Sequence, residues 1–137
     1  MNITRGDLVL IQNFDELSKK LNYNLIYNDK ENTLIKAVPM NMHSTSKLNL
    51  PETLNIGERA FFGNTFIFSV ILPEGLKTIG NYAFYNCSNL SSINIPTSVT
   101  SIGEMAFYGC TSLTSITILD GTHIGENAFY KSGINNK

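Results

Sequence analysis

Residues 90–110 read Leu-Ser-Ser-Ile-Asn-Ile-Pro-Thr-Ser-Val-Thr-Ser-Ile-Gly-Glu-Met-Ala-Phe-Tyr-Gly-Cys, and this stretch decides the fold. Its string Ile-Gly-x-x-Ala-Phe occurs four times in the chain, beginning at Ile56, Ile79, Ile102 and Ile124. The offsets between copies are 23, 23 and 22 residues. Self-similarity at a fixed spacing of 20–50 residues is the signature of a stacked repeat architecture.

The segments between these strings repeat as well. Leu90-x-x-Ile93-x-Ile95 returns in the same register at residues 67–72 and 113–118, with a partial copy at Leu48-x-Leu50. Alternation of this kind predicts a short strand whose apolar side chains face inward. Proline follows three of the four copies, at Pro51, Pro73 and Pro96, and ends the strand because it has no N–H to donate. Leu54, Leu76 and Val99 lie three residues past the proline.

The remainder of each repeat predicts a turn that returns the chain. The glycine of Ile-Gly suits a corner because it adopts backbone angles that other residues resist. Alanine and phenylalanine then follow on a compact helical or 3₁₀ turn. Stacking these coils aligns equivalent side chains into columns, and we expect phenylalanine and isoleucine columns. They contain Phe61, Phe84, Phe107 and Phe129, and Ile56, Ile79, Ile102 and Ile124.

In the register Leu-x-x-Ile-x-Ile-Pro-x-x-Val-x-x-Ile-Gly-x-x-Ala-Phe-x-x-Cys, the chain resembles the BspA-like leucine-rich repeat family over about residues 46–134. This resemblance implies a curved, right-handed solenoid with a parallel sheet on one face. It also implies a setting on bacterial or protozoan surfaces, where such proteins are implicated in adhesion to host matrix proteins. The expected fold class is an α/β solenoid, a right-handed superhelix of four 22–23-residue repeats with a small N-terminal α+β cap.

The two ends of the chain differ. Residues 1–45 are interpreted as a cap, with a short helix from Asn13 to about Leu21 and strands at 23–27 and 33–38, covering the first sheet edge. Residues 46–137 hold the repeats and stop mid-repeat without a capping helix. Solenoids normally need a polar cap. Truncation of a longer chain, end-to-end self-association and a folded-back polar tail are therefore all open.

Composition excludes several functions. The net charge is −1, which removes the electrostatic argument for nucleic acid. No run is long enough to span a bilayer, so membrane insertion is not expected. The N-terminus is not a signal peptide. The chain is therefore cytosolic, or it is secreted or surface-exposed with a signal removed or lying outside it.

No unique catalytic constellation is found, so we expect neither an enzyme nor a cofactor. Cys87 and Cys110 occupy equivalent slots and are interpreted as buried free thiols in preference to a disulfide; they fall short of a zinc site. His43 and His123 are interpreted as surface histidines. Glu58, Glu104 and Glu126 are interpreted as residues at helix N-termini, and the repeated glycines as corners without a phosphate-loop context.

Two surfaces remain as binding candidates for a protein or glycan. The first is a nearly uncharged strip of outward strand residues, which either binds a ligand or is simply a solvated face of the sheet. It contains Asn49, Ser69, Ile71, Ser92, Asn94, Ser115 and Thr117. The second is a row of aromatics on the convex side, which either contact a partner or pack over neighbouring turns. It contains Phe62, Tyr85, Tyr108 and Tyr130. A homo-oligomer formed through the C-terminal end is the alternative to a recognition module.

Overall fold

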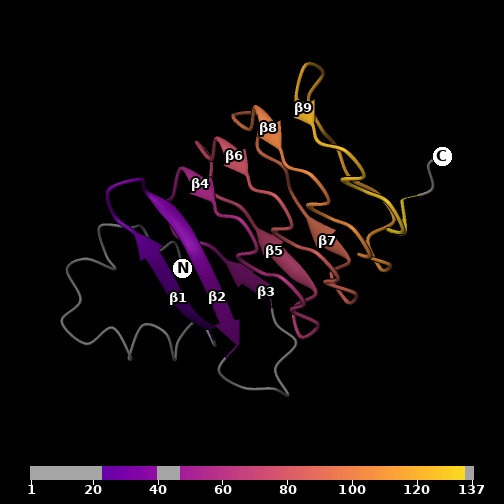
Figure 1. Ribbon diagram of the computed structural model, residues 1–137, viewed down its shortest axis with the longest axis horizontal. Helices are drawn as coiled ribbons and strands as arrows, with labels where there is room; N and C mark the ends of the chain where they lie inside the picture. Colours follow the sequence, from indigo (N-terminus) through magenta and orange to yellow (C-terminus); the bar gives the residue numbers. More distant parts are fainter. Residues whose placement is uncertain (1–22, 40–46, 135–137) are drawn as a thin grey trace.

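The chain forms a solenoid of four stacked coils preceded by a hairpin, as a computed structural model describes for residues 23–39 and 47–134. Figure 1 shows the coils side by side in sequence order, from the indigo hairpin to the yellow last coil. We number the coils 1 to 4, at residues 47–66, 67–89, 90–112 and 113–134. The predicted helix at 13–21 and His43 lie outside the described residues.

Two sheets run along the solenoid, where the sequence predicted one. The predicted sheet contains β3 (Lys47–Asn49), β5 (Ser69–Ile71) and β7 (Ser92–Ile93), paired in parallel. A second sheet is built from the residues that end in the Ile of Ile-Gly. It contains β4 (Asn55–Ile56), β6 (Thr78–Ile79), β8 (Ser101–Ile102) and β9 (His123–Ile124). The coil therefore carries a strand on each of two sides.

The predicted hairpin joins the second sheet. β1 (Tyr23–Asn28) pairs antiparallel with β2 (Thr33–Pro39), and β2 pairs in parallel with β4, with Leu34 opposite Ile56. The strand order of this sheet is β1-β2-β4-β6-β8-β9. Asn28 closes the hairpin turn by accepting hydrogen bonds from the Lys30 and Glu31 amides. The hairpin thus covers the edge of β4.

The expected columns of apolar side chains are present. The rings of Phe84 and Phe107 lie 5.1 Å apart and 4° from parallel, and Phe61 and Phe129 extend this column at 4.7 and 5.3 Å. Ile56, Ile79 and Ile102 are fully buried in the same core, whereas the last member, Ile124, is exposed. Contact between successive coils therefore buries what a single coil would leave open.

The turn after Ile-Gly is not confirmed as helical. In coil 1, Ala60, Phe62 and Asn64 each donate an amide hydrogen bond to the carbonyl three residues earlier. Every fourth residue of this segment has a positive φ, 60° at Arg59 and 69° at Gly63, and the same pattern recurs in later coils. Such residues interrupt a right-handed helix. The segment is a series of overlapping β-turns, and no helix occurs in the described ranges.

These turns pair with one another across coils. The amides of Arg59, Phe61 and Gly63 donate to the carbonyls of Asn81, Ala83 and Tyr85 at 3.0, 2.7 and 2.7 Å, and coils 2 and 3 repeat the arrangement. The glycine of Ile-Gly has a different role from the one expected, because its φ is not positive. A Cβ on Gly103 would lie 2.5 Å from the Asn81 amide nitrogen and 2.7 Å from the Gly80 carbonyl carbon. Glycine is therefore needed for close approach between coils.

Leu54 lies three residues past its proline, as Leu76 and Val99 do, but it is not buried as they are. Leu54 is 41% exposed, and Thr53 occupies the buried position. Five residues separate Leu50 from Ile56, but six separate Leu72 from Ile79, so the corner of coil 1 is one residue shorter. Thr53 satisfies its buried hydroxyl by donating to the Asn32 carbonyl at 3.0 Å.

Candidate binding faces

The outward residues of β3, β5 and β7 form the first candidate face. Ser69 lies opposite Ser92, and Asn49 lies opposite Ile71, as the expected alternation requires. Their neighbours Leu48, Val70 and Ile93 point into the core. Ser115 and Thr117 are exposed as well, but they lie outside any strand. The predicted strip is thus continuous through coil 3 and changes character at coil 4.

An open depression of about 360 Å³ lies at that change, between coils 3 and 4. It is lined by Ser91, Ser92, Ile93, Asn94, Ile95, Ser115, Ile116 and Thr117. Four of the seven predicted strip residues therefore meet there: Ser92, Asn94, Ser115 and Thr117. The lining contains serine, threonine, asparagine and isoleucine only, so the depression carries no formal charge.

Lost strand pairing opens this depression. Within the described chain, residues 114–118 form no main-chain hydrogen bond to coil 3, and β7 is the last strand of its sheet. On the other sheet β8 still pairs with β9. Coils 3 and 4 are therefore held together at the second sheet and at the turns, and they are separated along the first sheet.

Two features of coil 4 accompany this separation. Five residues separate Ile118 from Ile124, against six between Ile95 and Ile102, and Leu119 replaces the proline. Coil 1 has an equally short corner and keeps its pairing, so the short corner is not sufficient. Coil 4 also lacks a described coil on its outer side to hold the segment. Ile95 and Ile116, which line the opening, are only partly buried.

Asn94 has a structural contact that the sequence did not suggest. Its side-chain oxygen accepts a hydrogen bond from the Leu72 amide at 2.7 Å, and its side-chain nitrogen donates to the Leu72 carbonyl at 3.1 Å. In coil 1 the corresponding amide, Leu50, bonds to the main chain of Ile71. The Asn94 amide group thus replaces main-chain pairing between coils 2 and 3.

A second polar row, on the six-stranded sheet, was missed. It contains Thr33 of β2 and the residue before the Ile of each Ile-Gly, namely Asn55, Thr78, Ser101 and His123. Asn55 donates to the Thr33 hydroxyl at 3.3 Å and accepts from the Thr78 hydroxyl at 2.6 Å. The signal was present as a small polar residue directly before each isoleucine of Ile-Gly in coils 1 to 3. Because the side chains of Thr33, Asn55 and Thr78 bond to one another, this part of the row connects β2 to coils 1 and 2.

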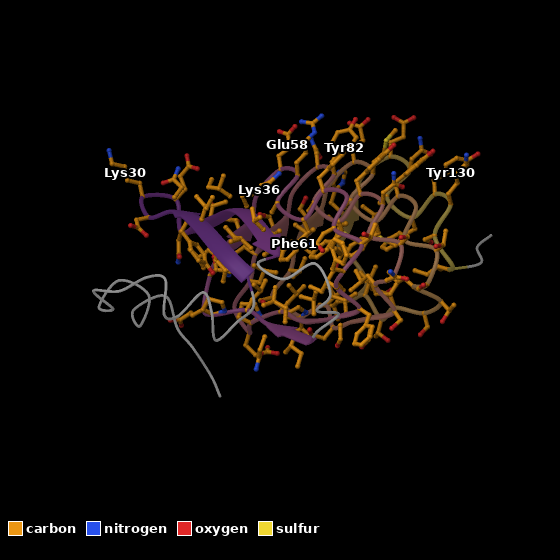
Figure 2. The ribbon with its side chains drawn as sticks, turned by 90° about the horizontal axis from the view of Figure 1, so that it is seen from below. Lys30, Lys36, Glu58, Phe61, Tyr82 and Tyr130 are labelled. Carbon is orange, nitrogen blue, oxygen red and sulfur yellow. The ribbon has the colours of Figure 1, made fainter. Side chains whose placement is uncertain are left out.

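The aromatic row is a stack. Phe62 and Tyr85 lie 4.8 Å apart at 3°, Tyr85 and Tyr108 lie 4.8 Å apart at 5°, and Tyr130 is tilted by 46° against Tyr108. Figure 2 shows Tyr130, with Glu58 and Tyr82, along one outer edge, while Phe61 lies within the coils. The ring faces of Phe62, Tyr85 and Tyr108 pack against one another in successive coils, as one of the two open interpretations proposed. Their edges remain accessible, with Phe62 and Tyr130 most exposed.

None of the charged side chains that the structure describes is buried. Arg59 pairs with Glu58 at 2.7 Å on the surface and lies 4.7 Å from the Tyr82 ring centroid. The glutamates after Ile-Gly do not begin helices, which corrects that interpretation. In the part of the chain that the structure describes, no three His, Cys, Asp or Glu side chains could hold a metal ion.

Both cysteines are buried free thiols. Burial raises the pKa of Cys110 to about 12 and the pKa of Cys87 well above the ordinary value of 9.0, and the nearby Cys110 contributes to the Cys87 shift. A reactive cysteine has a lowered pKa. These thiols therefore contribute to packing between coils.

No helix in the described ranges has the length and apolar character needed to cross a membrane. A family model described as "BspA type Leucine rich repeat region (6 copies)" matches residues 35–137, beginning inside β2. No curated protein matches the chain.

Solved structures with the same fold come from several bacteria. A leucine-rich repeat protein from Bacteroides capillosus shares 26% identity with a TM-score of 0.70, over 85% of this chain and 92% of that one. One from Bacteroides ovatus shares 28% identity with a TM-score of 0.69, over 81% of this chain and 32% of that one. A leucine-rich cell surface protein from Faecalibacterium prausnitzii shares 25% identity with a TM-score of 0.62, over 80% of this chain and 32% of that one. The chain thus spans about a third of the length of the last two.

Proposed function

Because the chain belongs to the BspA-type leucine-rich repeat family, we propose that it is a non-catalytic module that binds a protein or glycan through the face of β3, β5 and β7. We further propose that it acts in adhesion or host interaction as part of a cell-surface protein. The similar Faecalibacterium prausnitzii protein described as a cell surface protein supports this setting.

The observation that carries the proposal is the depression between coils 3 and 4. Ligand sites are concave and combine apolar walls with a few polar groups. Here Ile93, Ile95 and Ile116 supply apolar surface, and serine and threonine hydroxyls supply donors and acceptors. Because the lining is uncharged, the favoured ligand is neutral where it contacts this face.

Binding to arrays of extracellular-matrix proteins and glycans tests the proposal. We expect Ser92→Arg and Ser115→Arg to abolish binding, because each places a long charged side chain in the depression. Thr97→Arg is the matched control, since Thr97 is exposed but lies outside the lining. Unchanged binding by both variants at the depression would reject this face.

A second candidate function is self-assembly, favoured by the open end of coil 4. The amides of Asn127, Phe129 and Lys131 occupy the positions that donate to the next coil elsewhere, and they reach no acceptor in the described residues. Leu119, Ile124 and Tyr130 are also exposed there. A tail-to-tail pair would set donors against donors. Assembly would therefore run head to tail, toward the outer edge of β1, which ends the other side of the sheet.

Light scattering over a range of protein concentrations tests this candidate. Coils stacked head to tail along the solenoid axis would form an open filament, so the mass should rise continuously with concentration. Ile124→Arg should prevent that rise by placing a charge at the open end. A constant monomer mass would exclude self-assembly without affecting the binding proposal.

A further inference from the structure

The opening between coils 3 and 4 exposes the edge of a sheet as well as side chains. In coil 2 the Phe68 carbonyl accepts hydrogen bonds from the Ser91 and Ser92 amides, and in coil 1 the Leu50 amide donates to the Ile71 carbonyl. The equivalent groups of coil 3 are the Ser91 carbonyl and the Ile95 amide. Neither has a main-chain partner among the described residues. Unpaired groups on a strand edge are a template for another strand.

Given the binding function proposed above, on which this inference rests, we propose that the ligand is an extended peptide segment that adds to β7 as a parallel strand. Main-chain hydrogen bonds provide affinity in this mode of recognition, and alternate side-chain pockets provide specificity. The inserted strand would continue the sheet of β3, β5 and β7 in its existing register.

The chemistry of the opening and its unpaired main-chain groups favour a peptide over a sugar. The partly buried Ile95 and Ile116 would accept apolar side chains on one face of the strand, while Ser92 and Ser115 line it with small hydroxyls. We therefore expect a neutral segment that alternates small polar and β-branched residues. Coil 3 itself has this pattern in Ser92-Ile93-Asn94-Ile95.

Asn94 shows why the edge is open on one side only. Its side-chain amide group is committed to Leu72 in coil 2, so it stabilises the inner edge of coil 3. The outer edge has no such side chain, because Thr117 forms no hydrogen bond to coil 3 in the described structure. A peptide can therefore bind without displacing an existing bond between coils.

A capped peptide that copies residues 89–95, Asn-Leu-Ser-Ser-Ile-Asn-Ile, is the probe. Its binding to the full chain is measured by fluorescence anisotropy with a label on its N-terminus, and the contact is located by amide hydrogen exchange. We expect slower exchange at residues 91–95 and 114–118 on binding. Ser115→Arg should weaken binding at least about tenfold, whereas Thr97→Arg should leave it unchanged.

N-methylation of the probe separates main-chain pairing from side-chain contact. Methyl groups on every second amide remove the donors along one edge of the peptide and leave the side chains intact. The two alternate sets of methylated amides should differ by about tenfold or more in affinity, because only one edge faces β7. Equal affinities for both methylated probes would overturn strand addition.

The remaining outcomes distinguish this inference from the proposed function. If the peptide does not bind, but a glycan on the array binds and is lost with Ser115→Arg, strand addition is wrong and the face is still a binding site. If residues 114–118 already exchange slowly in the free chain, the gap closes on itself and strand addition is also wrong. If neither peptide nor array ligand responds to Ser115→Arg, both proposals fail.

Discussion

The thiol of Cys87 donates a hydrogen bond to the main-chain carbonyl of Phe61, 3.1 Å away in the preceding coil. Cys110 repeats the contact with the Phe84 carbonyl at 3.0 Å. Each thiol thus contacts a carbonyl in the coil before it and must remain protonated to donate. Asn64 and Ser132 occupy the corresponding slots of coils 1 and 4, where their side-chain oxygens accept hydrogen bonds from the Phe66 and Ile134 amides.

We expect the stability of the chain to fall in alkaline solution through these thiols. Burial raises their pKa values, so the unfolded thiols ionise from about pH 9 while Cys110 stays protonated in the fold up to about pH 12. The contribution of the protonated thiols to the free energy of unfolding is complete below pH 9 and is lost as the pH rises through this window. The loss is at most about 1.4 kcal/mol per pH unit for each thiol. Urea unfolding at pH 7 to 11 measures it. The Cys87→Ala/Cys110→Ala double variant should show a shallower decline; an identical decline would contradict the assignment.

Phe84→Ala should destabilise the chain by about 3–5 kcal/mol, because the ring is fully buried between two others. The control is Phe62→Ala, which removes a ring that is 43% exposed and should cost less than about 2 kcal/mol. Both free energies of unfolding come from urea titration. Equal costs would mean that the central ring column is not the main apolar contact between coils.

Replacement of Gly103 should be costly for a reason other than backbone angle. Alanine there places its Cβ against the main chain of coil 2, and the backbone must move at a cost of about 1–3 kcal/mol or more. Gly121 has a φ of 93° and open space around it, so Gly121→Asn should cost less than about 1 kcal/mol. Thermal unfolding of the two variants compares them. A harmless Gly103→Ala would contradict the close approach.

Asn94→Ala should cost about 1–3 kcal/mol, since it leaves both the amide and the carbonyl of Leu72 without their partner. Thr117→Ala, on the same face in the next coil, should be nearly neutral. Amide hydrogen exchange at Leu72 gives an independent measurement, because loss of the bond should accelerate it. Unchanged exchange would show that the Asn94 side chain does not hold coil 2.

Much of this architecture could be predicted because residues at equivalent positions of successive repeats lie next to each other in the stacked coils. Once Phe84 and Phe107 were equivalent, their stacking followed, and so did the inward direction of Val70 and Ile93. The alternation also placed Ser69 and Ser92 outside. None of these predictions required knowledge of the backbone angles at the corners.

The corners themselves could not be predicted. Arg59, Tyr82 and Met105 adopt left-handed backbone angles, although these residue types do not predict such angles. The sequence instead suggested unusual angles at the glycines of Ile-Gly. The second sheet was missed because only two residues per coil form it. The opening beside Ser115 accompanies the loss of main-chain pairing by residues 114–118, and a pattern of apolar spacing does not encode that loss.

The number of neighbouring coils determines how the described part of the molecule is expected to unfold. Among the described coils, coils 2 and 3 each contact a coil on both sides, whereas coil 4 contacts only coil 3, so its amides should exchange first and opening should progress inward. A substitution that removes the ring of Phe84 would divide the phenylalanine column into two parts, each with fewer coils than the minimum of about three that repeat folds need. The same substitution at Phe129 would only shorten the column by one ring.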